Sequence, residues 1–380
     1  MFWKHAILSA AITIMSAQPS SSGSPPAHQA KFFLYIGTYE KGVYAYRYST
    51  NGGSLDAIGL TGDVKNPSFL ATDRDFRSLY AVSELEGKVN GVVAAFAIDR
   101  ASGALKLLNA ESSAGEAPCH LSVDHSTKWL FVANYTSGNV SVFPIETGGR
   151  LGKMSDLFAA HGSGVNPKRQ EGPHAHQAVV SPDNRFLYVP DLGLDQIHIF
   201  RIDAAHGKLT PNDPPAAKVS AGYGPRHIAF TPDARFAYVI NELEPFVTIL
   251  AHDAASGQLR EIRSMSILPA GATGENGPAE IAVDRAGNFL YVSNRGPGTI
   301  AVFGINKEDG MLSPVQVAAT GGSWPRGFEL DPSGRFLFAG DQKADQFVIF
   351  DVDPASGKLS LTGRVYHVPS PVAFLFVPSK

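Results

Sequence analysis

Short apolar runs separated by polar turn residues recur along most of the chain. In residues 171–200, a polar cluster is followed by apolar runs at 178–180, 186–189 and 197–200, with Ser-Pro-Asp-Asn and Gly between them. Apolar runs of about 4 to 8 residues bounded by Gly, Pro, Asn and Asp are typical of β-strands. The stretch therefore predicts a small antiparallel sheet.

The same pattern repeats about every 50 residues, and the copies share turn residues as well as apolar positions. Copies begin at Pro67, Pro118, Pro173, Pro225, Pro278 and Pro325. A period of this length with four strands per copy indicates the blades of a β-propeller. The alternative is a β-sandwich with accidental similarity, which the shared turn chemistry disfavours.

The two ends of the chain complete one further blade. Only a first strand remains after Pro371, at 372–377, whereas the chain begins at 33–38 with the strand that should come second. Pairing these two strands closes the ring and removes two sheet edges. We therefore predict one all-β domain over residues 31–380: a seven-bladed β-propeller with four antiparallel strands per blade.

The turns indicate which face of the ring carries function. Short turns such as SPDNR, TPDAR and DPSGR join strands one and two, and an Asp-x-x-x-Gly pattern joins strands three and four. In an antiparallel sheet both sets lie on one face. The longer, irregular connections lie on the other face, where functional residues collect on a rigid scaffold.

Aligning the copies places a set of charged and imidazole side chains at the channel mouth on that loop face. First strands contribute His176, Arg226, Arg326, His120, Gln177 and His227, and the ends of second strands contribute Asp191, Glu242 and Arg295. Convergent polar groups in a pocket are the default hypothesis for a binding site. The alternative is that they pair with one another and plug the channel, Arg226 with Glu242 and Arg295 with Asp341. Asn134, Asn241 and Asn294 recur, so we expect them to cap strand ends.

Residues 1–30 differ from the rest. Lys4 and His5 precede an apolar stretch from Ala6 to Ala17, and a Ser/Pro-rich segment follows. This order is typical of a secretory signal peptide and a flexible linker, and it predicts a periplasmic or secreted protein. The apolar stretch is short for a membrane span. The alternative is that this stretch is not cleaved and anchors the protein in the membrane.

The net charge, the cysteine count and the histidine spacing bear on nucleic-acid binding, disulfides and metal binding. A net charge of −3 gives no electrostatic case for nucleic acid, and Cys119 is the only cysteine, so no internal disulfide forms. His174 and His176 share one face of a strand, but no third metal ligand accompanies them. We expect no metal, no cofactor, no membrane contact beyond an uncut signal, and a monomer.

The segments PHAH, SPDNRFLYVPDLGLDQI, GPRHIAFTPDARFAYVINEL, SNRGPGTIAVF and WPRGFELDP resemble the lactonase family of seven-bladed propellers. That family includes the bacterial 6-phosphogluconolactonase and the fungal carboxy-cis,cis-muconate lactonizing enzyme. The resemblance covers the chain from about Phe32 onward. It implies a catalytic set of His174 or His176 with Arg226, Glu242 and Arg295. Family members acting on a phosphosugar work in the cytosol, so an exported chain departs from them.

These residue types suit lactone opening. His176 or Glu242 can take a proton from the attacking water, and Arg226 can hold the charge developing on the carbonyl oxygen. Arg295 and Arg326 can grip a carboxylate or phosphate. We expect the ligand to be a small anionic lactone or sugar acid. The residues expected around it are His227, Gln177, Asp191 and His120. His227 is expected to support the residues that contact the ligand.

Three alternatives remain open from the sequence. The reaction could run as a carboxymuconate-type ring closure. YVSNRGPGTIAVF also resembles the repeats of secreted surface propellers that serve as non-enzymatic scaffolds. A sugar-acid binding protein could use the same pocket without turnover. The asymmetry of the His, Arg and Glu set favours a small anionic ligand.

Overall fold

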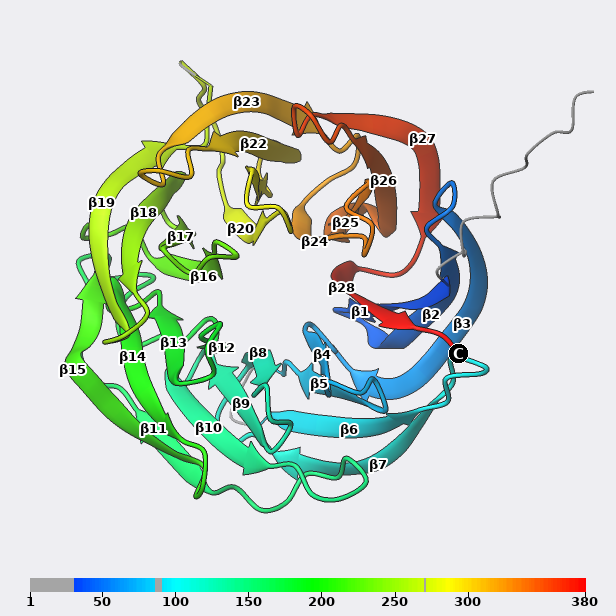
Figure 1. Cartoon of the computed structure of the whole chain (residues 1–380), viewed down its shortest axis with the longest axis horizontal. Helices are drawn as coiled ribbons and strands as arrows, with labels where there is room; N and C mark the ends of the chain where they lie inside the picture. The colour runs from blue at the N-terminus through cyan, green and yellow to red at the C-terminus, as the bar shows by residue number, and fades with distance from the viewer. Residues whose placement is uncertain (1–30, 86–90, 270) are drawn as a thin grey trace, which may run out of the picture.

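Seven four-stranded antiparallel sheets surround a central channel in this computed structural model, which describes residues 31–85, 91–269 and 271–380 (Figure 1). The sheets follow one another around the ring in sequence order. This confirms the predicted seven-bladed β-propeller.

The strands of each blade run from the channel outward. The first three blades contain β28 (Pro371–Pro378), β1 (Lys31–Thr38), β2 (Lys41–Ser49) and β3 (Ser54–Lys65); β4 (Leu70–Thr72), β5 (Ser78–Ser83), β6 (Val92–Ile98) and β7 (Leu105–Ser112); and β8 (Pro118–Val123), β9 (Trp129–Asn134), β10 (Asn139–Pro144) and β11 (Asp156–Ala159).

The fourth and fifth blades contain β12 (Val179–Val180), β13 (Phe186–Asp191), β14 (Gln196–Asp203) and β15 (Lys208–Lys218); and β16 (Pro225–Phe230), β17 (Phe236–Asn241), β18 (Phe246–Asp253) and β19 (Gln258–Ser266). The last two contain β20 (Pro278–Val283), β21 (Phe289–Asn294), β22 (Thr299–Ile305) and β23 (Leu312–Ala319); and β24 (Pro325–Leu330), β25 (Phe336–Asp341), β26 (Gln346–Val352) and β27 (Leu359–His367). A 3-10 turn, Gln342–Ala344, follows β25.

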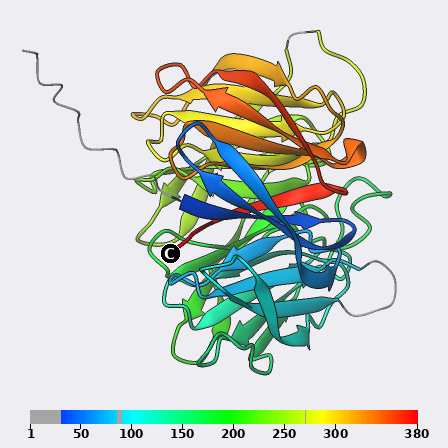
Figure 2. The same cartoon turned by 90° about the vertical axis from the view of Figure 1, so that its right-hand side faces the viewer.

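The first blade joins the two ends of the chain. β1 pairs antiparallel with β28, with Phe32 opposite Pro378 and Ile36 opposite Phe374. Figure 2 shows the red C-terminal strand beside the blue N-terminal strand. This confirms the predicted closure, in which the two terminal strands pair with each other and complete one blade.

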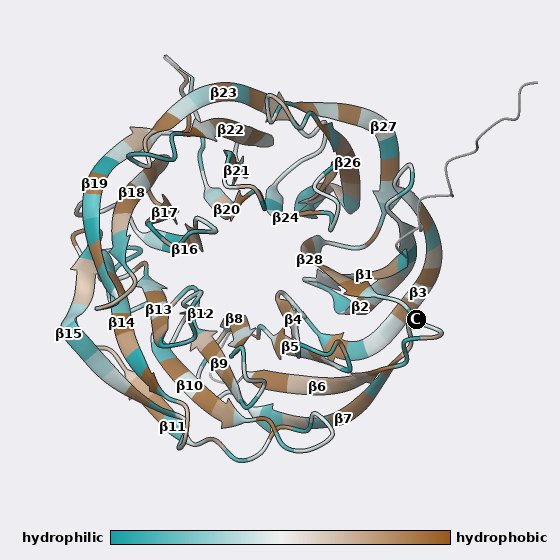
Figure 3. Ribbon diagram, in the orientation of Figure 1, coloured by the Kyte–Doolittle hydropathy of each residue, from teal (hydrophilic) through white to brown (hydrophobic). Residues whose placement is uncertain are grey.

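The core lies between neighbouring blades. Second strands such as β13 and β17 are buried at every position, which explains their continuous apolar runs. The outermost strands alternate hydrophilic and hydrophobic residues, as Figure 3 shows for β19 and β27. Only one side of an outer strand packs inward, so its polar residues face water.

Buried tyrosines bind five of the blades to the next blade. Tyr238 of β17 donates a hydrogen bond of 2.9 Å to the carbonyl of Gly310 in the strand-three to strand-four turn of the following blade. Gly310 has a φ of +75°, and a Cβ there would press on Phe236. Equivalent bonds run from Tyr35, Tyr80, Tyr188 and Tyr291. The turns between strands three and four therefore hold neighbouring blades together as well as reversing the chain.

In the part of the chain that the structure describes, no helix is long and apolar enough to span a membrane. The signal peptide and linker predicted for residues 1–30 lie outside the described residues.

Candidate active site

Glu242 is the centre of a cluster of charged side chains on the loop face of the channel. It follows the last residue of β17, and its N–H donates to the carbonyl of Gly224. The side-chain amide of Asn241 binds the carbonyl of Phe246, as expected for a residue that caps a strand end. The Glu242 side chain is 8% exposed. Its backbone is therefore fixed while its carboxylate faces the channel mouth.

Two buried arginines hold one oxygen of that carboxylate. Arg226 Nε and Arg295 Nη2 each lie 3.0 Å from Glu242 Oε2. Arg226 Nη1 also donates to the carbonyl of Ala279, and Arg295 Nε to that of Gly277. Arg226 and Glu242 belong to one blade and Arg295 to the next, so the predicted convergence is observed. Of the two pairings in the alternative interpretation, Arg226 with Glu242 is present, whereas Arg295 pairs with Glu242 and Asp341 accepts a hydrogen bond from Thr320.

A third arginine holds the other oxygen. Arg169 Nη2 lies 2.6 Å from Glu242 Oε1 and 3.1 Å from the hydroxyl of Tyr135. Burial acts to raise the pKa of Glu242, but the positive charges around it, Arg295 foremost, hold that pKa well below its usual range. Glu242 is therefore an anion at neutral pH.

His176 is the histidine that reaches this cluster. Its Nε2 lies 3.6 Å from Glu242 Oε2, and its ring is 4% exposed. Burial, reinforced by the charge of Arg226, lowers the pKa of His176 well below 6.5. A neutral imidazole therefore lies beside the carboxylate, in the state that can accept a proton.

His174 lies to one side of the cluster. Its ring stacks on Tyr135 with the centroids 4.7 Å apart, and its Nδ1 is 3.0 Å from the carbonyl oxygen of Tyr135. Its Nε2 is 3.3 Å from Glu171 Oε1. Of the two histidines left open by the sequence, His176 is thus the one beside Glu242.

Arg326 forms a second group across the mouth. Its Nη2 donates to the hydroxyl of Tyr39 at 2.5 Å and lies 3.7 Å from Glu84 Oε1. The guanidinium also sits over the Tyr39 ring, 4.8 Å from its centroid. These residues come from the seventh, first and second blades, so the mouth is lined by charged groups from several blades.

The remaining predicted residues lie deeper or away from the mouth. His227 Nδ1 is 2.9 Å from Glu280 Oε1, His120 packs on Phe69 with centroids 3.9 Å apart, and Gln177 Oε1 accepts the N–H of Ile228. These are contacts between inner strands that rigidify the channel wall. His227 therefore lies behind the mouth, next to the ring of His176 at 5.3 Å.

Asp191 is not brought to the mouth. Its Oδ1 accepts the N–H groups of His174 and Gly193, and its Oδ2 is 3.1 Å from His198 Nε2. The residue is fully buried. With both oxygens engaged inside the blade, Asp191 shapes the loop that carries His174, which differs from the substrate contact expected from the sequence.

Arg169 is the site residue that sequence reasoning missed. It lies in the connection between β11 and β12, which has no counterpart in the other copies, so the repeat register assigns it no position. The polar run KRQEG just before PHAH was the available signal.

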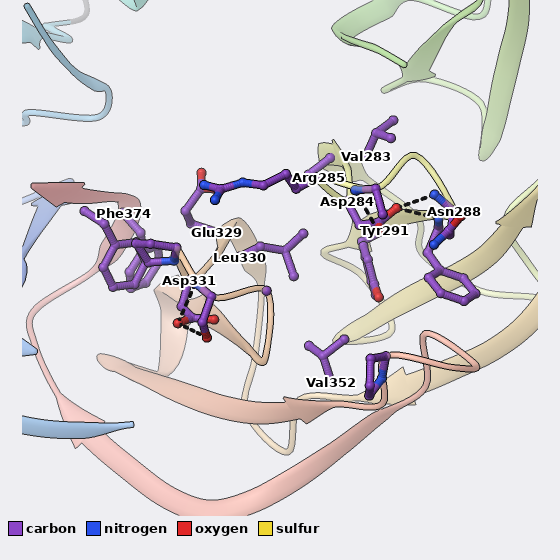
Figure 4. Close-up of a pocket in the computed structure, with 18 of the residues that line it drawn as sticks. Val283, Asp284, Arg285, Asn288, Tyr291, Glu329, Leu330, Asp331, Val352 and Phe374 are labelled. Carbon is purple, nitrogen blue, oxygen red and sulfur yellow. Dashed lines mark hydrogen bonds between the residues drawn. The ribbon is translucent and has the colours of Figure 1, made fainter. Parts of the chain in front are cut away.

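The opposite mouth of the channel is a separate feature. A cavity of about 620 Å³ opens there among the ends of β20, β24 and β28 (Figure 4). Asp284 and Asp331 line it, but their carboxylates accept backbone N–H groups of their own turns. Glu329 and Arg285 also line this cavity. It lies on the short-turn face, away from Glu242.

No group of three or more His, Cys, Asp or Glu side chains in the described ranges is arranged to hold a metal ion. The cluster around Glu242 itself consists of a carboxylate, a neutral imidazole and several guanidinium groups. Burial lowers the pKa of Arg295 only to about 10, so it stays charged at neutral pH. Guanidinium groups can bind anions and can stabilise a negative charge that develops during a reaction.

Fold and site together define a β-propeller with a cluster of carboxylate, imidazole and guanidinium groups at the loop-face mouth of its channel. The chain belongs to the lactonase family of 7-bladed β-propellers, whose family model matches residues 33–376. This confirms the resemblance seen in the sequence.

Named relatives have similar sequence and structure. The chain is 36% identical over 291 residues to 6-phosphogluconolactonase of Bacillus subtilis, covering 75% of this chain and 81% of that protein. It is 34% identical over 287 residues to 6-phosphogluconolactonase of Formosa agariphila, covering 73% and 80%. The structure of a periplasmic gluconolactonase from Pseudomonas aeruginosa superposes with a TM-score of 0.88 and 32% identity, over 92% of this chain and all of that one.

Proposed function

We propose that this chain hydrolyses the ring ester of a sugar-acid lactone at the loop-face mouth of its channel. The observation that carries the proposal is the contact of Glu242 with three arginines beside the neutral His176. The names of the relatives, 6-phosphogluconolactonase and gluconolactonase, support hydrolysis of a lactone over ring closure or a purely structural role.

Each group has a role in the proposed reaction. Water attacks the lactone carbonyl carbon, and His176 Nε2 takes the proton of that water. Arg226 holds the tetrahedral oxyanion. The bond to the ring oxygen then breaks, and His176 returns the proton to that oxygen, leaving a hydroxy acid. The new carboxyl group then loses its proton to solvent, Arg295 binds the carboxylate, and Glu242 keeps both arginines oriented.

A pH-stat assay tests this function. Purified protein is presented with gluconolactone, its 6-phosphate and other aldonolactones, and the rate is corrected for spontaneous opening. Acceleration of at least one lactone is the expected result. A folded sample that accelerates none of them overturns the proposal and leaves a binding protein.

The pH dependence gives a sharper prediction. We expect the acid limb of kcat/KM to lie below pH 6.5, because burial and Arg226 disfavour the charged form of His176. This limb reports groups of the free enzyme, where the base must be unprotonated. His176→Asn should lower the rate by about 10²–10⁴. An acid limb at or above pH 6.5 in the wild type would contradict this assignment.

Export is proposed as well. Lys4, the apolar stretch up to Ala17 and the Ser/Pro segment support it, and the Pseudomonas aeruginosa neighbour is a periplasmic protein. Mass spectrometry of the mature chain from a periplasmic fraction should find an N-terminus beyond Ala17. An intact Met1 in a cytosolic fraction is incompatible with export.

A further inference from the structure

Arg169 differs from the other two arginines that bind Glu242. Its side chain is 43% exposed, whereas those of Arg226 and Arg295 are 3% and 9% exposed. It also comes from an irregular connection, and the other two lie on or next to inner blade strands. Arg169 is therefore the member of this set that solvent and an incoming ligand can reach directly.

The backbone that carries Arg169 is fixed. The next residue, Gln170, is fully buried; its Nε2 donates to the carbonyl of Leu192 and its Oε1 accepts the N–H of Asn166. The N–H of Gly164 in turn binds the carbonyl of Gln170. The loop is thus anchored beside Arg169, and a change in its contacts requires only rotation of its long side chain.

The two oxygens of Glu242 are held differently. Oε2 is bound by the buried Arg226 and Arg295, but Oε1 is bound by Arg169. If the Arg169 side chain rotates away, Arg226 and Arg295 still hold Glu242 in place, and its Oε1 becomes accessible from the channel mouth. The guanidinium would lose a charged hydrogen bond, and an oxyanion on the ligand would replace it with one of the same kind.

We propose that Arg169 is the residue that selects lactones carrying an oxyanion substituent, a phosphate or a second carboxylate. Such a substituent draws the guanidinium from Glu242 Oε1 into a two-pronged contact. A neutral lactone offers no such exchange, so Arg169 keeps Oε1 covered. This specificity role rests on the proposed lactonase function.

The test compares three lactones on two variants. Wild type, R169Q and the control R260Q are assayed on gluconolactone, its 6-phosphate and glucarolactone, which carries a carboxylate. Arg260 lies exposed on β19, the outermost strand of the blade that carries Glu242, and so faces away from the channel. For R169Q we expect kcat/KM on a charged lactone, relative to the neutral one, to fall about 10- to 100-fold.

The charged substrate that shows the loss identifies the oxyanion. A loss with the 6-phosphate points to phosphate, and a loss with glucarolactone points to carboxylate. R260Q should keep the wild-type ratio. An unchanged ratio in R169Q, or an equal loss on all three lactones with a lowered melting temperature, overturns the proposal.

A pH profile provides a readout that a purely structural role would not move. The charge of Arg169 contributes to the low pKa of Glu242. Loss of that positive charge also favours protonation of His176, whose Nε2 lies 3.6 Å from Glu242 Oε2, so R169Q should move the acid limb of kcat/KM on gluconolactone, which His176 sets, to higher pH. R260Q should not move it.

Product binding separates this proposal from the proposed function. Calorimetric titration with 6-phosphogluconate, glucarate and gluconate needs no turnover. Wild type should prefer an acid that carries a second oxyanion by about tenfold or more, and R169Q should lose that preference. If no lactone is hydrolysed, the proposed function fails, and this titration still decides whether Arg169 selects oxyanions.

Discussion

Arg226→Lys is expected to lower kcat/KM for lactone opening by about 10²–10³ while leaving the melting temperature nearly unchanged. Arg226 is 2% exposed and bridges Glu242 and the carbonyl of Ala279. A planar guanidinium can keep both contacts and still present an N–H to an oxyanion. Lysine offers one ammonium on a flexible stem and cannot reproduce this arrangement. Rates and thermal melts of the same samples test the prediction.

Arg226→Ala and a distant control complete the experiment. Glu242 keeps Arg295 at 3.0 Å and Arg169 at 2.6 Å after Arg226 is removed, so its charge stays compensated. We therefore expect Arg226→Ala to lose activity more than stability. Arg260→Lys, on the outer strand, should behave as wild type. Full activity in Arg226→Ala would remove this residue from the reaction.

The fold could be predicted because its signals are local and repeated. Each copy carries apolar strands and the same turn chemistry, so one register fixes all blades, and the leftover strands at 33–38 and 372–377 specify the closure. The tyrosine contacts between blades, such as Tyr238 to Gly310, were not foreseen. They join residues of different copies, and no single copy reveals its neighbour.

The site could be predicted only in part, because the repeat pattern fixes where a residue lies in its blade but not what its side chain contacts. The register brings Arg226, Glu242 and Arg295 to one mouth, but it does not determine side-chain rotamers. Arg295 consequently turned out to pair with Glu242 and not with Asp341. Asp191 has the register of a mouth residue, yet nearby backbone N–H groups and His198 bind it inside the blade. Arg169 lies outside the repeat, where periodicity carries no information.

Glu242→Leu is expected to destabilise the protein by about 3–5 kcal/mol at neutral pH. The substitution leaves Arg226 and Arg295 buried, at 3% and 9% side-chain exposure, without the carboxylate that compensates them. Arg169 is exposed and can turn to water, so it adds little to this loss. Urea denaturation of wild type and variant measures the difference. A matched control is Glu244→Leu, two residues away and exposed, which should change stability little.

The pH dependence of that difference checks its electrostatic origin. The arginines hold the pKa of folded Glu242 well below 4.5, its ordinary value, against the opposing effect of burial. A carboxyl with a depressed folded pKa stabilises the protein above its unfolded pKa, and that contribution is lost as the pH falls through the folded pKa. The stability gap between wild type and Glu242→Leu should therefore be full above about pH 4.5 and shrink in stronger acid. A gap that is absent at neutral pH, or that widens on acidification, would show that the arginines do not depend on Glu242 for their burial.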